Sequence, residues 1–249
     1  MKISIVTAVY NRQTTIAQAM QSVRSQTHGP VEHILQDGGS SDATLEIITD
    51  IAGPNTLLHS GSDGGIYDAI NKGIARATGD VIGLMHSDDY FAHDDVLARI
   101  AAALADPNID GVYGDLDYVA AADTNRVVRH WKSGEMTRAK LKRGWMPPHP
   151  TLYLRRSVFE RLGDYDTSYQ IAADYDAMLR WLWTGRVKLT YIPEVLVKMR
   201  VGGESNRSLG RVLQKSREDY RALRSNDVGG VAALLNKNLS KIGQFVLRK

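Results

Sequence analysis

Gly79-Asp-Val-Ile-Gly-Leu-Met-His-Ser-Asp-Asp-Tyr90 is the stretch that decides the fold, because it joins an apolar segment to two adjacent carboxylates. The segment from Val81 to Met85 is short and uncharged, which is typical of a strand buried on both faces. Asp88 and Asp89 follow at its carboxyl end, the edge where open α/β sheets bind ligands. Oxygen ligands of this kind suit Mg²⁺ or Mn²⁺, especially where substrate phosphates complete the coordination. A solvated turn that caps the next helix is the alternative.

Strand and helix patterns alternate on both sides of this stretch. Before it, they predict strands at 2–9, 32–36 and 56–59, and helices at about 13–26, through Leu45 and Ile48, and from Ile66 to Ala77. This alternation predicts a parallel, doubly wound sheet with right-handed crossovers. Beyond it, we expect a helix at 93–105, a strand at 111–118, a strand and a helix within 151–162, a helix through Leu179 and Leu182, and strands at 187–192 and 195–199 on either side of Pro193. Between 126 and 143 the pattern changes to a run with seven basic residues and one Glu.

The composition excludes several classes of protein. With 249 residues, 43% of them hydrophobic and 24% charged, the chain can bury a sizeable core as one large domain or as a domain with an appendage. Zero cysteines exclude disulfides, thiolate metal sites and cysteine nucleophiles. No apolar run approaches the ~18 residues that span a bilayer, and Met1 to Val6 enters a strand without a signal-peptide pattern. We therefore expect a cytoplasmic protein.

The C-terminal part of the chain is basic. Residues 198–249 contain twelve Lys or Arg against four Asp or Glu, a balance of +8, whereas residues 1–197 have a balance of −5. We expect an amphipathic helical tail there, with one apolar stripe formed by Leu209, Leu213, Tyr220 and Leu223, and a second formed by Val231, Leu235, Ile242 and Val246 and opposed by Lys237 and Lys241.

Peripheral contact with an anionic phospholipid surface is one interpretation of such a tail. A solvated helix, a homodimer interface and docking onto the protein's own body are the alternatives. Nucleic-acid binding is not expected, because the basic regions lack interleaved aromatic residues and any recognised module.

Short motifs occur in order along the chain. They are Val6-Thr-Ala-Val-Tyr-Asn11, Gln36-Asp-Gly-Gly-Ser-Ser-Asp-Ala-Thr44, Ser62-Asp-Gly-Gly-Ile-Tyr-Asp-Ala-Ile-Asn-Lys-Gly73, Gly79-Asp80, His86-Ser-Asp-Asp89 and Ala173-Asp-Tyr-Asp176. Each is weak alone, but together they resemble the family-2 inverting glycosyltransferases of the GT-A fold, over about residues 2–205. The sequence is most similar to the bacterial enzymes that assemble O-antigen, capsule or other envelope polysaccharides.

The resemblance implies an α/β, GT-A (Rossmann-like) fold, with a mixed, mainly parallel sheet flanked by helices and a C-terminal helical extension. It divides the chain into a glycosyltransferase domain at 1–204 and a basic tail at 205–249. Within the domain, residues 1–118 would be the nucleotide-binding half and residues 119–204 the acceptor half.

On the donor side, the resemblance implies a set of binding residues: Thr7, Tyr10, Asn11, Asp37, Asp63, Lys72, Ser87 and Asp88. Asp37 would accept a hydrogen bond from the imide N–H of uracil, since a carboxylate offers only acceptors. The alternative for Asp37 is a turn residue that binds its own backbone. Lys72 would face the phosphates, or else lie on a solvated helix face.

The metal site departs from the family pattern at one position. Asp88 corresponds to the last aspartate of the DxD element, which holds the Mn²⁺ or Mg²⁺ that bridges both phosphates. His86 stands in the place of the first aspartate. This leaves Asp88 and Asp89 as candidate acidic ligands, while His86 is either a further ligand or a hydrogen-bonded wall of the pocket.

Asp174 matches the catalytic base of the family, at the start of a helix. One carboxylate there would take the proton of the acceptor hydroxyl as its oxygen attacks the anomeric carbon, in a single displacement with inversion. A plain helix cap is the alternative. On the acceptor or phosphate side, the resemblance adds Trp145, His149, Asp176 and Arg200; Trp145 would stack on a sugar ring or belong to the core.

These expectations describe a metal-dependent hexosyl- or N-acetylhexosaminyl-transferase. It would move a sugar from a nucleoside diphosphate donor, with UDP favoured, to a glycan or polyprenyl-diphosphate-linked acceptor. A degenerate glycosyltransferase-like binding or assembly subunit is the main alternative, supported only by His86. A sugar nucleotidyltransferase is less favoured, because no glycine- and basic-rich phosphate loop lies near the N-terminus.

Overall fold

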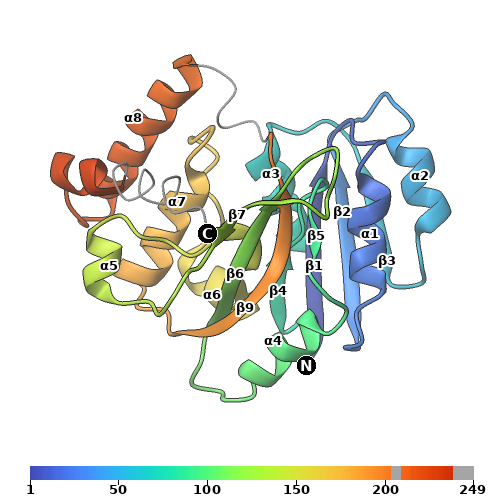
Figure 1. The fold of residues 1–249 in the computed structure, drawn as a ribbon, viewed down its shortest axis with the longest axis horizontal. Coiled ribbons are helices and arrows are strands. Elements are labelled where there is room, and N and C mark those ends of the chain that lie inside the picture. The colour runs from blue at the N-terminus through green and yellow to red at the C-terminus, as the bar shows by residue number, and fades with distance from the viewer. Residues whose placement is uncertain (203–208, 238–249) are drawn as a thin grey trace.

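The computed structural model describes residues 1–202 and 209–237, which form one mixed α/β body (Figure 1). The elements are, in chain order, β1 (Ile3–Val9), α1 (Ile16–Arg24), β2 (Val31–Asp37), α2 (Thr44–Ile51), β3 (Thr56–Ser60), α3 (Ile66–Arg76), β4 (Val81–Leu84), β5 (Tyr90–Phe91), α4 (Val96–Ala103), β6 (Gly111–Val119), β7 (Val127–Trp131), α5 (Arg138–Lys142), the 3₁₀ turn η1 (His149–Thr151), β8 (Tyr153–Arg155), α6 (Arg156–Leu162), α7 (Ala173–Met178), the π-helix η2 (Leu179–Thr184), β9 (Leu189–Arg200) and α8 (Leu209–Ser225). A further helix begins at Val231 and continues to Lys237, the last described residue.

The strands of the described residues form one sheet in the order β3-β2-β1-β4-β8-β6-β9-β5, with β7 paired to β6. β1 pairs in parallel with β2 and β4, and β2 pairs in parallel with β3. β8 runs antiparallel between β4 and β6, so the sheet is mixed but mainly parallel, as predicted. The expected nucleotide-binding and acceptor halves share this sheet.

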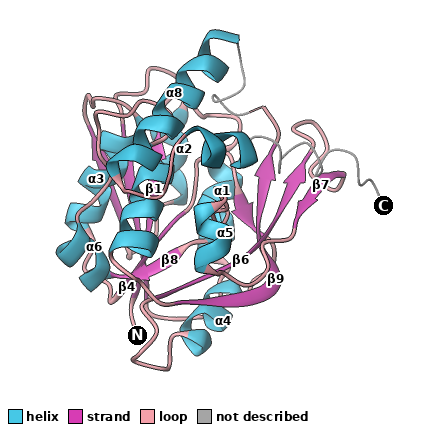
Figure 2. Ribbon diagram, turned by 90° about the vertical axis from the view of Figure 1, so that its left-hand side faces the viewer, coloured by secondary structure: helices cyan, strands magenta, loops and turns pink. Residues whose placement is uncertain are grey.

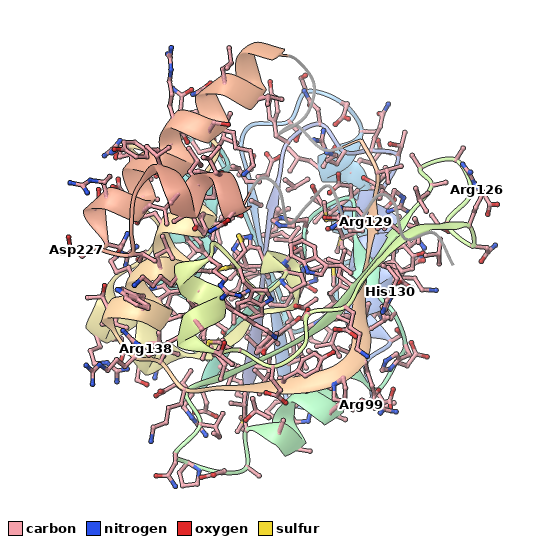
Figure 3. The ribbon with its side chains drawn as sticks, turned by 60° about the vertical axis from the view of Figure 1, so that its left-hand side comes forward. Arg99, Arg126, Arg129, His130, Arg138 and Asp227 are labelled. Atoms are coloured by element: carbon pink, nitrogen blue, oxygen red, sulfur yellow. The ribbon has the colours of Figure 1, made fainter. Side chains whose placement is uncertain are left out.

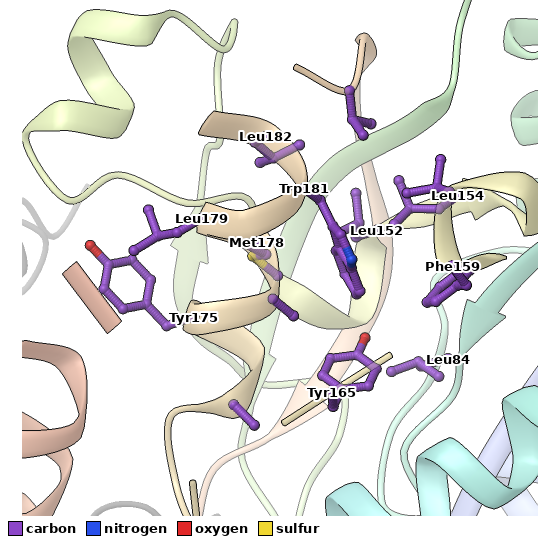
Figure 4. Close-up of a cluster of buried hydrophobic side chains, with 14 of the residues drawn as sticks. Leu84, Leu152, Leu154, Phe159, Tyr165, Tyr175, Met178, Leu179, Trp181 and Leu182 are labelled. Atoms are coloured by element: carbon purple, nitrogen blue, oxygen red, sulfur yellow. The ribbon is translucent and has the colours of Figure 1, made fainter. Parts of the chain in front are cut away.

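Helices cover both faces of the sheet (Figure 2). One face packs against α3, α6 and α7, where the rings of Tyr165 and Phe159 each meet the edge or face of Trp181 at centroid distances of 5.4 and 5.2 Å (Figure 4). The other face packs against α1 and α4 through residues such as Val23 and Leu97. Burial of strands such as β4 on both faces explains why their sequences are uniformly apolar.

Two strands differ from the expectation. β9 continues through Pro193, where a break was predicted. Tyr191 pairs with Tyr113 and Val195 with Asp115, so Pro193 falls in an irregular part of the ladder, where its missing N–H costs no strand hydrogen bond. The basic segment after Arg126 contains β7, which pairs only with β6 among the described strands; Figure 3 shows Arg129 and His130 on it.

The described part of the predicted tail is helical over 209–225 and 231–237, and its apolar stripes are divided between the surface and the core. Leu213 and Tyr220 of α8 are 64% and 38% exposed, while Leu223 is buried. Lys237 was expected on a solvated face, but it is 1% exposed, with its ammonium 2.6 Å from the carboxylate of Asp219. A buried lysine needs such a partner, because desolvation of an unpaired charge is very costly. This part of the tail therefore docks onto the body, beside α7 (Figure 1).

Val231 and Leu235 are exposed at 60% and 55%, and the remaining members of the second predicted stripe, Ile242 and Val246, lie outside the described residues together with Lys241. Within residues 1–202 and 209–237, no helix has both the length and the apolar character needed to cross a bilayer.

The burial of His33 makes the free energy of unfolding depend on pH. His33 lies in β2 with its Nε2 2.9 Å from the hydroxyl of Thr7, and burial lowers its pKa to about 4. Because histidine in the unfolded chain has a pKa of about 6.5, the unfolded state binds a proton first as pH falls. The stability contributed by neutral His33 is thus complete above pH 6.5 and is lost toward pH 4. Through this residue alone, the free energy of unfolding should fall by about 2 kcal/mol between pH 7 and pH 5.

The variant His33→Gln tests this, because glutamine retains a polar group beside Thr7 but does not titrate. Urea unfolding at pH 7 and pH 5 should show a loss about 2 kcal/mol smaller in the variant than in the wild type. An equal loss in both proteins would contradict the prediction.

Candidate active site

The carboxyl ends of three parallel strands meet at one edge of the sheet. Val9 at the end of β1 pairs with Asp37 at the end of β2, and Val6 pairs with Leu84 at the end of β4. The segments that follow these strands therefore lie side by side, and they carry the predicted donor and metal residues.

The turn after β2 is built around Asp37. Its carboxylate is fully buried and accepts hydrogen bonds from the N–H groups of Gly39 and Ser40 at 3.0 and 3.1 Å, and from the hydroxyl of Ser60 at 2.6 Å. Asn11, with a φ of 50°, accepts a bond from the N–H of Ser41 at 2.9 Å. Both side chains hold this turn in the structure, and uracil binding by Asp37 stays a prediction.

Gly38 brings the two other donor candidates together. A Cβ atom on Gly38 would lie 2.7 Å from Oδ2 of Asp63 and 3.5 Å from the ring of Tyr10. The Tyr10 side chain is 58% exposed, so an accessible aromatic ring lies beside the carboxylate that packs against Gly38.

Three donor candidates have other contacts. Thr7 is fully buried, with its hydroxyl on His33. Lys72 pairs with Asp68 at 2.8 Å, and Ser87 is buried, with its carbonyl accepting the Thr15 hydroxyl at 2.9 Å. The structure does not bring the Thr7 side chain to the edge where Tyr10 and Asp63 meet.

The two adjacent aspartates have different surroundings. Asp89 is 1% exposed and accepts the N–H of Arg200 at 3.2 Å; burial, followed by the neighbouring Asp88 charge, raises its pKa well above the usual range. The Arg200 guanidinium donates to the carbonyl of Asp88 and to the side chain of Gln18. Asp88 itself is half-buried. Arg200, at the end of β9, is thus bound to the loop that follows β4 and carries Asp88. The carboxylate of Asp89 is buried against the main chain of β9.

His86 and Asp88 fit a divalent cation. Burial lowers the pKa of His86, although the negative charges of Asp88 and Asp174 act to raise it. The imidazole is therefore neutral, which is the form that can bind a metal ion. Within the described part of the chain, no cluster of three or more His, Asp or Glu side chains is arranged to hold a metal. Two side chains completed by phosphate oxygens are the pattern that suits Mg²⁺ or Mn²⁺ in nucleotide sites.

His149 lies beside His86, with 5.7 Å between the ring centroids. Its Nε2 is 2.8 Å from the hydroxyl of Tyr165, and burial lowers its pKa to about 4. Burial also raises the pKa of Tyr165, so this hydrogen bond joins a protonated tyrosine to a neutral imidazole. His149 therefore does not supply a positive charge near neutral pH.

Asp174 stands in the first turn of α7, as predicted. Its Oδ1 accepts the N–H of Tyr175 at 2.8 Å, and the Tyr67 hydroxyl is 3.4 Å away. Burial raises its pKa, but His149, Lys215, Lys237 and the Tyr175 N–H outweigh burial, so the pKa of Asp174 is lowered. An ionised carboxylate at this place can accept a proton.

Tyr67 and Asn71 of α3 were not among the predicted site residues, although the Ser62–Gly73 motif contains both. The Tyr67 hydroxyl donates to the carbonyl of Ile171 at 2.7 Å. Asn71 donates to the carbonyl of Tyr165 at 2.8 Å and accepts its N–H at 3.0 Å. These contacts join α3 to the loop before α7. The Ser62–Gly73 motif pointed to these two residues, but their partners lie about a hundred residues away in the sequence, so the motif did not reveal the contact.

Two acceptor candidates have structural contacts. Trp145 donates from Nε1 to the carbonyl of Ser133 at 3.1 Å and packs edge-on against Tyr113. Asp176 is 6% exposed and accepts a bond from Asn226 of α8 at 2.9 Å. These contacts match the core alternative for Trp145, and they tie Asp176 to α8.

Comparisons with known proteins agree with this geometry. The family model described as Glycosyl transferase family 2 matches residues 4–163. A "PGL/p-HBAD biosynthesis glycosyltransferase" of Mycobacterium tuberculosis H37Rv is 32% identical over 208 residues, which cover 82% of this chain and 78% of the relative.

Two solved structures share the fold. The S. aureus TarS 1–349 complex with UDP-GlcNAc has a TM-score of 0.70 and 19% identity, over 92% of this chain and 66% of that one. The mannosyltransferase PcManGT of Pyrobaculum calidifontis, in complex with GDP-Man and Mn²⁺, has a TM-score of 0.66 and 15% identity, over 99% of this chain and 76% of that one.

The contact between α3 and Tyr165 predicts a stability effect. Asn71→Ala should lower the free energy of unfolding by about 1–3 kcal/mol, because it leaves the Tyr165 N–H and carbonyl without their partner. The neighbouring change Lys72→Ala should cost less than about 1 kcal/mol, since it removes a partly exposed ion pair. Denaturant unfolding of both variants measures the difference, and equal effects would contradict the role given to Asn71.

Proposed function

The chain belongs to glycosyltransferase family 2, and on this premise we propose that it moves a sugar from a nucleoside diphosphate to an acceptor hydroxyl with inversion. The observation that carries the proposal is the ionised carboxylate of Asp174 beside His149, His86 and Tyr67, next to the edge that holds Asp88. A base and a diphosphate-binding edge are what a single displacement requires.

In the proposed reaction, Asp174 takes the proton of the acceptor hydroxyl. The acceptor oxygen forms a bond to the anomeric carbon while the bond from that carbon to the diphosphate breaks, and the diphosphate leaves with the electron pair. The hydrogen bond from the Tyr175 N–H and the contact of Tyr67 hold the carboxylate in place. Neutral His149, held by Tyr165, would be a polar wall facing the acceptor.

Mn²⁺ or Mg²⁺ would be held by Asp88 and His86, and when bound it would neutralise the charge that develops on the leaving diphosphate. Fold neighbours crystallised with UDP-GlcNAc and with GDP-Man and Mn²⁺ support a nucleotide-sugar donor and a divalent cation. We favour UDP, because Asp37 offers acceptors for the imide N–H of uracil close to the exposed Tyr10 ring. Binding there requires that Asp37 exchange part of its turn hydrogen bonds.

The proposed acceptor is a lipid-linked glycan of the cell envelope, with the protein at the inner face of the membrane. The name of the mycobacterial relative, which refers to PGL/p-HBAD biosynthesis, supports a glycolipid or related acceptor. The outer face of α8 supports membrane contact: Leu213, Arg217, Tyr220 and Arg224 recur at helical spacing and are all exposed. Both acids of this helix, Glu218 and Asp219, are turned toward the body instead.

The paired variants Asp174→Asn and Asp88→Ala separate catalysis from donor binding. Asp174→Asn should leave the UDP dissociation constant in Mn²⁺ within about twofold and lower transfer by at least about 10²-fold, because it removes only the base. Asp88→Ala should weaken UDP binding in Mn²⁺ to the level seen after chelation. Calorimetry with UDP measures binding, and UDP release from UDP-GlcNAc or UDP-glucose with a polyprenyl-diphosphate-linked sugar measures transfer.

Asp50→Ala, which removes an exposed carboxylate of α2, is the matched control and should change neither value. Wild-type transfer by Asp174→Asn would refute the base assignment. Absence of binding to UDP, GDP and dTDP by folded protein would favour a degenerate binding or assembly subunit instead.

Vesicle binding tests the membrane proposal. The protein should co-sediment with vesicles containing phosphatidylserine or phosphatidylglycerol more strongly than with phosphatidylcholine vesicles. The double variant Arg217→Glu and Arg224→Glu should bind at least about tenfold more weakly, since each basic residue near the surface contributes ~1 kcal/mol. Arg161→Glu on α6 is the control. Equal binding by both variants would argue against contact through α8.

A further inference from the structure

The helix that carries Asp174 has no N-terminal cap of its own. α7 begins at Ala173, and its N-cap residue, Ala172, has no side chain that could accept a hydrogen bond. The N–H groups before and within the first turn of a helix need partners from elsewhere, and an anion is favoured there by the helix dipole.

Glu218 of α8 supplies partners for the N–H groups directly before this turn, while the first-turn N–H of Tyr175 is bound by Asp174 itself. Oε2 of Glu218 accepts the N–H of Ile171 at 2.8 Å and the N–H of Ala172 at 2.9 Å, and its Oε1 is 3.3 Å from the N–H of Gln170. One carboxylate from a distant helix thus binds three consecutive N–H groups directly before the helix of the base.

The peptide groups of Ile171 are held from two sides. While its N–H donates to Glu218, its carbonyl accepts the hydroxyl of Tyr67 on α3 at 2.7 Å. Asp174 follows three positions later, and the Tyr67 hydroxyl also lies 3.4 Å from its carboxylate. The direction of the Asp174 side chain therefore depends on a segment clamped between α3 and α8.

Asp219, the next residue of α8, is linked to the segment that follows Asp174. Asp219 is 1% exposed and pairs at 2.6 Å with Lys237, whose ammonium lies 3.0 Å from the centre of the Tyr175 ring. The side chain of Lys237 fits against Gly144, where a Cβ would approach its Cβ to 2.5 Å. Helix α8 thus contacts the chain immediately before Asp174 through Glu218, and Asp219 of α8 holds Lys237 of the following helix against the residue immediately after Asp174.

We propose that Glu218 is a positioning residue for sugar transfer: it caps α7 and so aims Asp174 at the acceptor hydroxyl. The inference rests on the proposed role of Asp174 as base. Loss of this contact would leave donor binding intact, because Glu218 binds residues 170–172, whereas Tyr10, Gly38 and Asp63 belong to the turns that follow β1, β2 and β3. It would lower the rate of the chemical step, since a displacement of about 1 Å at a reacting group costs up to about 10²-fold.

The experiment compares Glu218→Ala with Glu218→Gln, which retains one carbonyl oxygen for the Ile171 and Ala172 N–H groups. At saturating donor and acceptor, kcat should fall between about tenfold and hundredfold in Glu218→Ala and by less in Glu218→Gln, while the KM for the donor and the calorimetric UDP affinity change less than twofold. Circular dichroism and the UDP binding stoichiometry report the folded fraction. Glu160→Ala, which removes an exposed carboxylate from α6, is the matched control and should keep the wild-type kcat.

Each result decides one point. A wild-type kcat in Glu218→Ala, alongside an inactive Asp174→Asn, would overturn the positioning role and leave the proposed function standing. A kcat that falls only in proportion to the UDP-binding fraction, or equally in Glu160→Ala, would also overturn it. An active Asp174→Asn would show that the base assignment failed first. If Glu218→Ala does not fold, Glu218→Gln decides by the same readout: a lower kcat at unchanged UDP affinity supports the inference, and a wild-type kcat refutes it.

Discussion

Parallel pairing of β1 with β2 and β4 is the constraint on which the rest of the structure depends. The register that sets Val9 against Asp37 and Val6 against Leu84 brings the ends of three strands to one edge. These strands are buried on both faces, so a slip of one residue would turn their side chains to the wrong side of the sheet. The donor turn, the exposed Tyr10 and the His86–Asp88 loop all occupy their places because of this register.

The second half of the molecule is tied to that edge by polar contacts as well as by core packing. Asn71 and Tyr67 of α3 bind the loop that runs from Tyr165 to Ile171, and Glu218 of α8 binds the same loop from the opposite side. Buried polar groups of this kind allow few alternative arrangements, because each lost partner leaves an unsatisfied donor or acceptor. Helix α7 thus gains a defined position that apolar packing alone would not give.

Burial has opposite effects on the ionisable groups of the site. It lowers the pKa of His86 and of His149. The pKa of Asp174 is lowered despite its burial, because the interactions with His149, Lys215 and Lys237 and the Tyr175 N–H outweigh desolvation. A neutral imidazole and an ionised carboxylate are the forms suited to metal ligation and to proton acceptance. The replacement of the first DxD aspartate by His86 is therefore compatible with a working donor site.

Local pattern was enough to predict the elements up to β6 except the two-residue strand β5, the mainly parallel sheet and the place of Asp174 at a helix start, because strand and helix periodicities and turn residues act over a few positions. The family itself was identifiable from the order of the motifs. Asp37 was assigned to the nucleotide, but the structure shows that it also holds its own turn, which is an interaction the sequence allowed for only as an alternative.

The sequence by itself determined most of the strands and helices of the parallel part of the sheet and which carboxylates follow them, but not β5, β7 or α5. Only the tertiary structure decided that Lys237 is buried on Asp219, that β9 passes through Pro193, and that Tyr67 and Glu218 meet at Ile171. The physical reason is the distance along the sequence over which each interaction acts. Periodicity and capping depend on neighbours within a turn or two of chain. The partner of a buried charge, or of an uncapped helix end, depends on which distant segment packs beside it.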